Sequence, residues 1–254
     1  MGKEAIHTEL LWKIPLALLG GVTGLLIVGA LVVAVCALLS DPRREYNEEN
    51  PFLCGVLTVS ARLVLLVSGI RLEVRGLDKL PTDRPLLMVC NHRSNYDPIV
   101  SWIALSGWRP VFVSKPSNFA IPFYGRIIHR CRFMAIDRED PRKAMATIRR
   151  AADLMTEHGA NVFVYPEGTR SKDGRLLPFH AGVFKIAQKA DAPVAVLTVT
   201  GTEQVHKNAP WRRTTVCLEV QEVIPAETVK AQRSTALSDA VWETMRPLVD
   251  VPQA

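Results

Sequence analysis

The sequence lacks the cysteine and histidine patterns that build disulfide scaffolds or metal centres. Its five cysteines are scattered over 254 residues, and no two form a Cys-x-x-Cys pair. An odd, scattered set argues against a disulfide framework and indicates a reducing compartment. Most of the histidines show no metal-ligand spacing either, so we expect no bound metal. These histidines are His7, His129, His158, His180 and His206.

Two further absences narrow the function. No Gly-x-Ser-x-Gly segment is present, which argues against a serine hydrolase of the nucleophile-elbow type. No helix-turn-helix, RNP-like or zinc-finger pattern accompanies the net charge of +6, so nucleic acid is not an expected partner. Residues 71–254 carry 26 Lys/Arg against 19 Asp/Glu, whereas residues 1–70 carry five against six. The basic excess indicates anionic lipid or phosphorylated substrates.

A long apolar segment stands near the N-terminus. Ile14 to Ser40 contains no charged residue, and as a helix it would extend roughly 40 Å, more than the ~30 Å of a bilayer core. A cleaved signal peptide has a shorter apolar region followed by small residues. Val35 is bulky for the position before a lipoprotein cysteine. We therefore expect an uncleaved transmembrane helix over residues 14–40.

A second apolar run covers residues 52–70 and is interrupted by Arg62. It is either a buried helix or an interfacial or re-entrant helix whose arginine reaches the lipid–water boundary, and we favour the second reading. The two sides of the first segment carry nearly equal numbers of basic residues, so these residues specify the orientation of the segment only weakly. The basic remainder and the missing disulfide pattern favour the cytoplasmic face of the cell membrane. We expect a membrane anchor over residues 1–71 and a globular domain over residues 72–254.

Beyond residue 72, short apolar runs alternate with helical patterns. Asp97-Pro98 and Asp140-Pro141 predict helix starts with aspartate as the N-cap, and Gly159 predicts a helix end. Expected strands cover residues 86–90, 111–113, 161–165, 193–200 and 216–223, and expected helices cover residues 98–105, 141–158, 181–190 and 237–248. This alternation predicts an α/β fold with a mixed, largely parallel sheet flanked by helices.

Two loops that follow predicted strands carry reactive groups. In Asn91–Pro98, His92 and Asp97 are close enough in sequence for the carboxylate to hold one imidazole nitrogen and leave the other as a general base. The alternative is that Asp97 only caps a helix. In Val164–Ser171, Gly168 permits close approach of a ligand and Arg170 offers a planar donor for phosphate. The alternative is a strand-to-loop turn with a surface arginine.

A basic stretch, residues 126–150, holds eight Lys/Arg against three Asp/Glu. Most charge runs are solvated faces. Here Arg126, Arg130 and Arg132 alternate with apolar residues, which suits a cationic wall near a membrane.

With these segments in order, residues 72–205 resemble the glycerolipid acyltransferase family, specifically the lysophosphatidic acid acyltransferases. His92 through Asp97 resembles the family's His-x4-Asp motif, and residues 125–138 resemble the second motif, whose phosphate-contacting arginine matches Arg138. Residues 165–171 resemble the third motif, with Tyr165 where phenylalanine is usual. Residues 192–196 resemble the fourth, with Ala195 where proline is common.

The resemblance implies transfer of a fatty acyl group from acyl-CoA or acyl carrier protein to the sn-2 hydroxyl of 1-acylglycerol 3-phosphate, giving phosphatidic acid without a cofactor. It assigns catalysis to His92 and Asp97. It assigns substrate binding to Arg138, Glu167, Gly168, Thr169 and Arg170. Glycerol 3-phosphate, another lysophospholipid or an amino-acid lipid are alternative acceptors. A non-catalytic lipid-binding protein on the same fold is the alternative from a different class.

Overall fold

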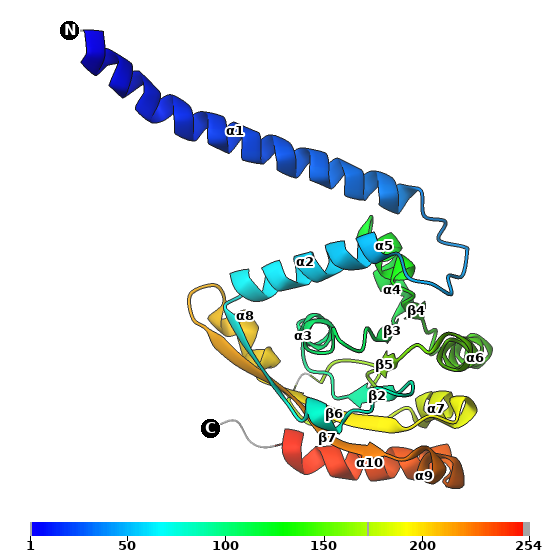
Figure 1. Ribbon diagram of the computed structural model, residues 1–254. Coiled ribbons are helices and arrows are strands. Elements are labelled where there is room, and N and C mark those ends of the chain that lie inside the picture. The colour runs from blue at the N-terminus through cyan, green and yellow to red at the C-terminus, as the bar shows by residue number, and fades with distance from the viewer. Residues whose placement is uncertain (1, 172, 251–254) are drawn as a thin grey trace. The chain divides into compact units, whose positions relative to one another are not determined.

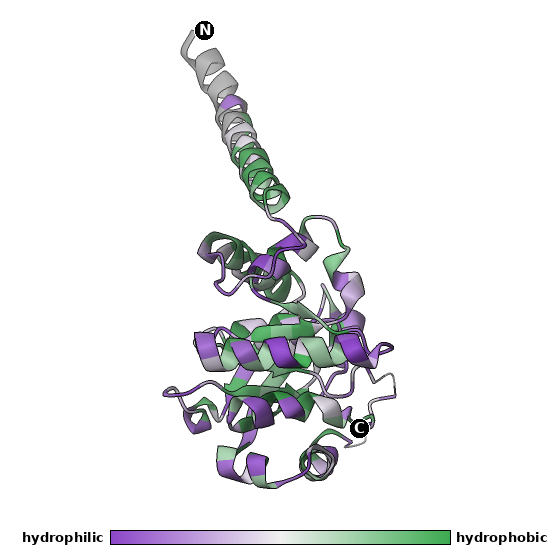
Figure 2. Cartoon of the chain, turned by 90° about the vertical axis from the view of Figure 1, so that its right-hand side faces the viewer, coloured by the Kyte–Doolittle hydropathy of each residue, from purple (hydrophilic) through white to green (hydrophobic). Residues whose placement is uncertain are grey.

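The computed structural model describes residues 2–171 and 173–250 and divides them into two units, one ending at Arg44 and one beginning at Glu45 (Figure 1). The first unit is the helix α1 (Gly2–Leu38) with the turn that follows it. Leu19–Leu38 is long and apolar enough to cross a membrane, by length and composition. Figure 2 shows this part of α1 as almost uniformly hydrophobic, whereas the helices of the second unit carry hydrophilic bands.

The second unit is an α/β sandwich, as the sequence predicts. Its described strands are β1 (Ile70–Arg75), β2 (Leu87–Cys90), β3 (Val111–Ser114), β4 (Met134–Ala135), β5 (Val162–Val164), β6 (Val194–Thr200) and β7 (Thr214–Ile224). They form one sheet in the order β1-β7-β6-β2-β5-β3-β4. Only the β6–β7 pairing among these strands is antiparallel. The predicted mixed, largely parallel sheet is confirmed.

Helices cover both faces of the sheet. The α-helices of this unit are α2 (Pro51–Val67), α3 (Asp97–Ala104), α4 (Pro116–Phe119), α5 (Tyr124–Arg130), α6 (Pro141–His158), α7 (Lys185–Ala190), α8 (Val205–Asn208), α9 (Ala226–Ala231) and α10 (Ser234–Val249). Short 3₁₀ helices are η1 (Leu77–Lys79), η2 (Ala181–Phe184) and η3 (Thr202–Gln204). Alternate strand residues such as Leu87 and Val89 pack in one core with α6, α7 and α10.

The opposite face of the sheet is aromatic. Phe112 and Phe163, which point away from the α6–α7–α10 core, stack with ring centroids 4.6 Å apart, and Trp102 of α3 lies 6.2 Å from Phe112. Phe163 is fully buried, a burial that stabilises the fold by about 2–3 kcal/mol. The α3 helix, which begins next to His92, is therefore fixed by packing on the sheet.

The start of α6 follows the predicted capping chemistry. The Asp140 carboxylate accepts hydrogen bonds from the N–H groups of Arg142 (3.0 Å) and Lys143 (3.2 Å), and Pro141 occupies the first turn. Gly159 ends the helix in the left-handed conformation, with φ of 60°. The N-cap at Asp140 and the end at Gly159 are confirmed.

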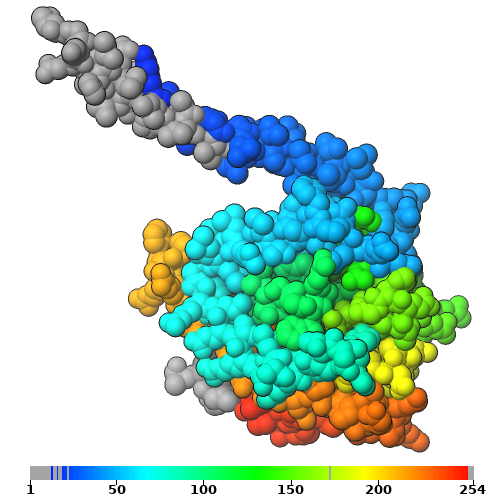
Figure 3. Space-filling model, in the orientation of Figure 1, coloured from blue at the N-terminus to red at the C-terminus, as the bar shows by residue number. Residues whose placement is uncertain are grey.

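The second apolar run is a helix with two different faces. In α2, Leu53, Cys54, Ala61 and Leu65 are buried, while Phe52, Val59, Leu63, Leu66 and Val67 are exposed. The helix packs on α3 and α5, and Figure 3 shows it at the surface of the second unit. The chain therefore divides into its two compact units between residues 44 and 45, ahead of α2. The sequence-based boundary at residue 71 falls inside β1, because apolar composition alone grouped α2 with the anchor.

Candidate active site

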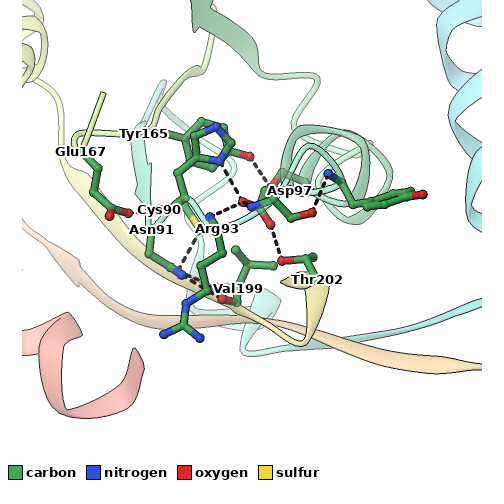
Figure 4. Close-up of polar contacts among 12 residues, drawn as sticks. Cys90, Asn91, Arg93, Asp97, Tyr165, Glu167, Val199 and Thr202 are labelled. Atoms are coloured by element: carbon green, nitrogen blue, oxygen red, sulfur yellow. Dashed lines mark hydrogen bonds and ion pairs between the residues drawn. The ribbon is translucent and has the colours of Figure 1, made fainter. Parts of the chain in front are cut away.

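Three neighbouring parallel strands end at the same edge of the sheet. β2 lies between β5 and β6, and both pairings are parallel. The carboxyl ends of these strands lead into Asn91–Asp97 (the His92 loop), Tyr165–Ser171 (the Gly168 loop) and Gly201–Thr202. Parallel strands bring such loops together at one edge, where α/β proteins place their ligands. Side chains far apart in the sequence therefore meet here (Figure 4).

Asp97 is the centre of the hydrogen-bond network and is fully buried. Its Oδ2 accepts from His92 Nδ1 at 2.8 Å and from the N–H groups of Arg93 (2.6 Å) and Ser94 (2.7 Å). Its Oδ1 accepts the Thr202 hydroxyl at 2.5 Å. The prediction that Asp97 is a helix N-cap is wrong. The N-cap is Tyr96, because the Asp97 side chain turns back toward the loop that precedes α3.

His92 is held in a single orientation. Its Nδ1 lies against Asp97, and its ring stacks on Tyr165 with centroids 4.3 Å apart and an interplanar angle of 21°. The side chain keeps 18% of its surface exposed. No described residue hydrogen-bonds to His92 Nε2. An imidazole with Nδ1–H on a carboxylate and a free Nε2 is arranged to accept a proton from a bound hydroxyl.

Glu167, in the Gly168 loop, binds the backbone of the His92 loop. Its buried carboxylate accepts the N–H of His92 at 2.5 Å and the N–H of Leu177 at 3.0 Å. In return, the His92 carbonyl accepts the N–H of Ser171 at 2.9 Å. Burial raises the pKa of Glu167 to about 7, although the two N–H donors oppose that rise. These contacts indicate that Glu167 positions the His92 backbone.

Gly168 lets Arg138 approach the Gly168 loop. Gly168 has φ of +72°, and a Cβ added there would lie 2.7 Å from Cδ2 of His180 and 3.1 Å from Cζ of Arg138. A residue with a side chain would therefore be strained and would push both neighbours away. Thr169, Arg170 and Arg138 are all exposed. The predicted second and third motifs thus meet at Gly168.

Sequence reasoning missed three supporting residues. Asn91 bridges β2 and β6, since its Nδ2 donates to the Val199 carbonyl (2.9 Å) and its Oδ1 accepts the Val199 N–H (2.7 Å). Arg93 donates to the carbonyls of Gly174 (2.7 Å) and Val249 and pairs with Glu203 at 3.9 Å. Thr202 holds Asp97. No local pattern signals the side-chain contacts just named, whose partners lie at least 81 positions away along the chain.

A sequence model described as Acyltransferase matches residues 71–200, which include the His92 loop, Arg138 and the Gly168 loop. The chain belongs to the acyltransferase family. This acyltransferase also shares its fold with a solved structure, the 1-acyl-sn-glycerophosphate acyltransferase PlsC from Thermotoga maritima. The two are 23% identical with a TM-score of 0.63, and the match covers 88% of each chain.

Curated relatives of this acyltransferase carry related names. A chloroplastic 1-acyl-sn-glycerol-3-phosphate acyltransferase, BAT2, of Brassica napus is 40% identical over 52% of this chain and 38% of its own length. The enzyme of that name from Limnanthes douglasii is 30% identical over 65% and 58%. The alpha form from Bos taurus is 27% identical over 87% and 75%. The chain thus spans between about two fifths and three fifths of the first two relatives.

Proposed function

We propose that this acyltransferase transfers a fatty acyl group from an acyl thioester to the sn-2 hydroxyl of 1-acyl-sn-glycerol 3-phosphate, forming phosphatidic acid. The observation that carries the proposal is the His92–Asp97 pair, at 2.8 Å, with Nε2 of His92 directed away from the carboxylate. Membership of the family and the names of the relatives supply the acyl-transfer reaction and the acceptor.

The proposed step needs one base and no acyl-enzyme. His92 Nε2 takes the proton of the acceptor hydroxyl while the oxygen attacks the thioester carbonyl. The tetrahedral intermediate collapses with loss of the thiolate, which receives the proton from the imidazolium. Asp97 fixes the tautomer and stabilises the imidazolium through Nδ1. The oxyanion needs donors, and the N–H groups of Gly168 and Ser171 already bind carbonyls. We assign this task to amides at Thr169 and Arg170.

The acceptor phosphate has a natural place beside Gly168. Arg138 approaches this glycine, and Arg170 follows two positions later. Guanidinium groups bind phosphate through paired N–H donors. Both are exposed, as a group must be to meet a phosphate that arrives from a membrane surface. We propose Arg138 and Arg170 as phosphate ligands, with Gly168 and Thr169 shaping the site.

We further propose that α1 anchors the enzyme in the cell membrane with the second unit on the cytoplasmic face. The support is the 20-residue apolar span Leu19–Leu38. Both the acceptor and the product are lipids, so an anchored enzyme meets them without extracting them into water. Either acyl-CoA or acyl carrier protein thioester can serve as the donor in this proposal.

An acyl-transfer assay on the detergent-purified full chain tests the proposal. Labelled acyl-CoA and acyl carrier protein thioester are supplied separately with lysophosphatidate, glycerol 3-phosphate or lysophosphatidylcholine. We expect labelled phosphatidate from lysophosphatidate with the wild type and none with His92→Ala, which keeps its circular dichroism spectrum. Label in a different lipid would overturn the acceptor, and no product from any pair would overturn the enzyme assignment.

A further inference from the structure

Two cysteines outside the active site lie against each other. Cys54 is on α2, and Cys131 follows the last residue of α5, 77 positions away. Their Sγ atoms are 2.8 Å apart, and the residues are 5% and 2% exposed. A disulfide has an S–S distance of about 2.05 Å, so the sulfurs need to approach by only about 0.8 Å. The sequence showed an odd, scattered set of cysteines, and the fold makes a pair of two of them.

The surroundings favour thiolate at one of the two sulfurs. The hydrogen bond between the two thiol groups lowers the pKa of Cys54, and the cationic Arg132 and Arg130 lower it further, although burial opposes this. Glu49 Oε2 lies 3.9 Å from Cys54 Sγ. Its charge is offset by ion pairs with Arg109 and Arg132. The thiolate is the form of cysteine that reacts with oxidants.

A small oxidant has a route to Cys54. A cavity of about 310 Å³ lies between α2 and the end of α3, and Cys54 is part of its wall together with Thr58, Trp102 and Arg109. A water molecule occupies about 30 Å³ of liquid, so hydrogen peroxide fits easily. Cys131 is not part of this wall. The two sulfurs therefore have different access, which assigns the first encounter with an oxidant to Cys54.

The other cysteines are differently placed. Cys90 is fully buried at the end of β2, and burial raises the pKa of its thiol well above the usual range. Cys217 lies on β7, where burial also raises its pKa. Cys36 belongs to the first unit. In the part of the chain that the structure describes, only Cys54 and Cys131 have sulfurs in contact. Cys90 and Cys217 are therefore internal controls.

We propose that Cys54 and Cys131 are a redox-active dithiol that hydrogen peroxide converts to a disulfide joining α2 to the end of α5. The Cys54 thiolate attacks one peroxide oxygen, the O–O bond breaks, and a sulfenic acid and hydroxide form. Cys131 attacks the sulfenic sulfur, the S–S bond forms and hydroxide leaves. The two thiol protons convert the two hydroxides into water. Two thiols and one peroxide thus give one disulfide and two waters, and a thiol reductant reverses the change.

The test is disulfide mapping on the full chain. Reduced protein in detergent is treated with about one equivalent of hydrogen peroxide, denatured in the presence of N-ethylmaleimide, digested and analysed by mass spectrometry. We expect a Cys54–Cys131 cross-linked peptide lighter by two hydrogens than the separate peptides in most molecules. Dithiothreitol should remove the link, and maleimide should still label Cys217 after denaturation. Labelling of Cys54 and Cys131 to the same extent as Cys217, or a link to another cysteine, would overturn the proposal.

Matched variants separate the two roles. Cys131→Ser should leave a sulfenic acid on Cys54 that dimedone captures, with no cross-link. Cys54→Ser should leave Cys131 unmodified by the same peroxide dose, and Cys217→Ser should form the link like wild type. Equal dimedone capture at Cys131 in the Cys54→Ser variant would contradict the assignment of Cys54 as the first sulfur. Because the cross-link is measured in wild type, a variant that folds poorly does not decide the result.

Discussion

The His92 loop and the Gly168 loop lie side by side at one sheet edge, yet they differ in how far the protein fixes them. Asp97, at the end of the first, is fully buried, and four groups donate to its two oxygens. Thr169 and Arg170, at the end of the second, are exposed, as is Arg138 beside it. In the proposed reaction, proton transfer requires one geometry, whereas the lipid phosphate must enter and leave. The difference suggests that rigidity is concentrated at the base and access at the phosphate.

The largest effect is expected for a substitution that disrupts the hydrogen bonds of the His92 loop. In Asp97→Asn, the NH₂ group replaces an oxygen that accepts from backbone donors or from Thr202, and the His92 tautomer is no longer fixed. We expect kcat to fall by about 10³-fold or more, with KM for lysophosphatidate little changed. Steady-state kinetics checks this. A kcat within tenfold of wild type, in protein with an unchanged circular dichroism spectrum, would contradict the role of Asp97.

A smaller effect, on KM rather than on kcat, is expected at Arg138 beside the Gly168 loop. Arg138→Ala removes a charged donor from the phosphate, so we expect kcat/KM to fall about 10- to 100-fold, mainly through KM. Arg138→Lys should recover part of the loss, since it keeps the charge without the planar donor pair. Arg84→Ala is the matched control, because Arg84 is exposed before the amino end of β2, away from the site. An equal KM rise in the control would refute the assignment.

Thr202 tests how firmly Asp97 must be held, because its hydroxyl donates to the Asp97 carboxylate. Thr202→Val keeps the shape but leaves Asp97 Oδ1 without its hydroxyl donor in a buried site. We expect kcat to fall about fivefold to tenfold with KM little changed, since Asp97 is then held less firmly against His92. Thr202→Ser should restore kcat. An unchanged kcat, or no rescue by serine, would point to a packing role instead.

The smallest effect concerns the link between the loops. Because the pKa of Glu167 is raised from 4.5 to about 7 in the folded protein, the folded state binds that proton more tightly than the unfolded chain. This stabilising contribution is fully present below pH 4.5 and is lost as pH rises through about 7. The Tm of wild type relative to Glu167→Gln should therefore fall between about pH 5 and about pH 8. A constant Tm difference over that range would show that the pKa of Glu167 is not raised in the folded protein.

Much of the fold followed from local patterns. The strand ranges 86–90, 161–165 and 193–200 are observed as β2, β5 and β6, since continuous apolar runs suit strands buried on both faces. The start of α6 at Asp140 and its end at Gly159 were also predicted, because an aspartate side chain caps backbone N–H groups and a glycine adopts the left-handed conformation, as the structure shows. The strands β1 and β4 were not predicted. One begins inside an apolar run, and the other has two residues, too few to show a period.

The sequence predicted most residues of the site and one of its contacts, between His92 and Asp97, but not the other contacts. His92, Asp97, Arg138 and Gly168 were named from motifs, and the structure brings the first two together and the last two together. The substrate-binding role that the resemblance gave to Glu167 stays a prediction, and the sequence did not show that its carboxylate accepts backbone N–H groups. Thr202, Arg93 and Cys131 could not be found, because their partners are set by strand order and helix packing rather than by sequence spacing.

Arg93 also makes the loop that holds the base depend on a helix that is synthesised much later. This residue, next to His92, binds the carbonyl of Val249 at the end of α10, 156 positions later in the chain. Because synthesis proceeds from the N-terminus, α1 and the His92 loop emerge before α10. The loop that holds the base therefore lacks its Val249 partner until α10 has been made. On this view, the contacts around the base are completed only some time after α1 has emerged.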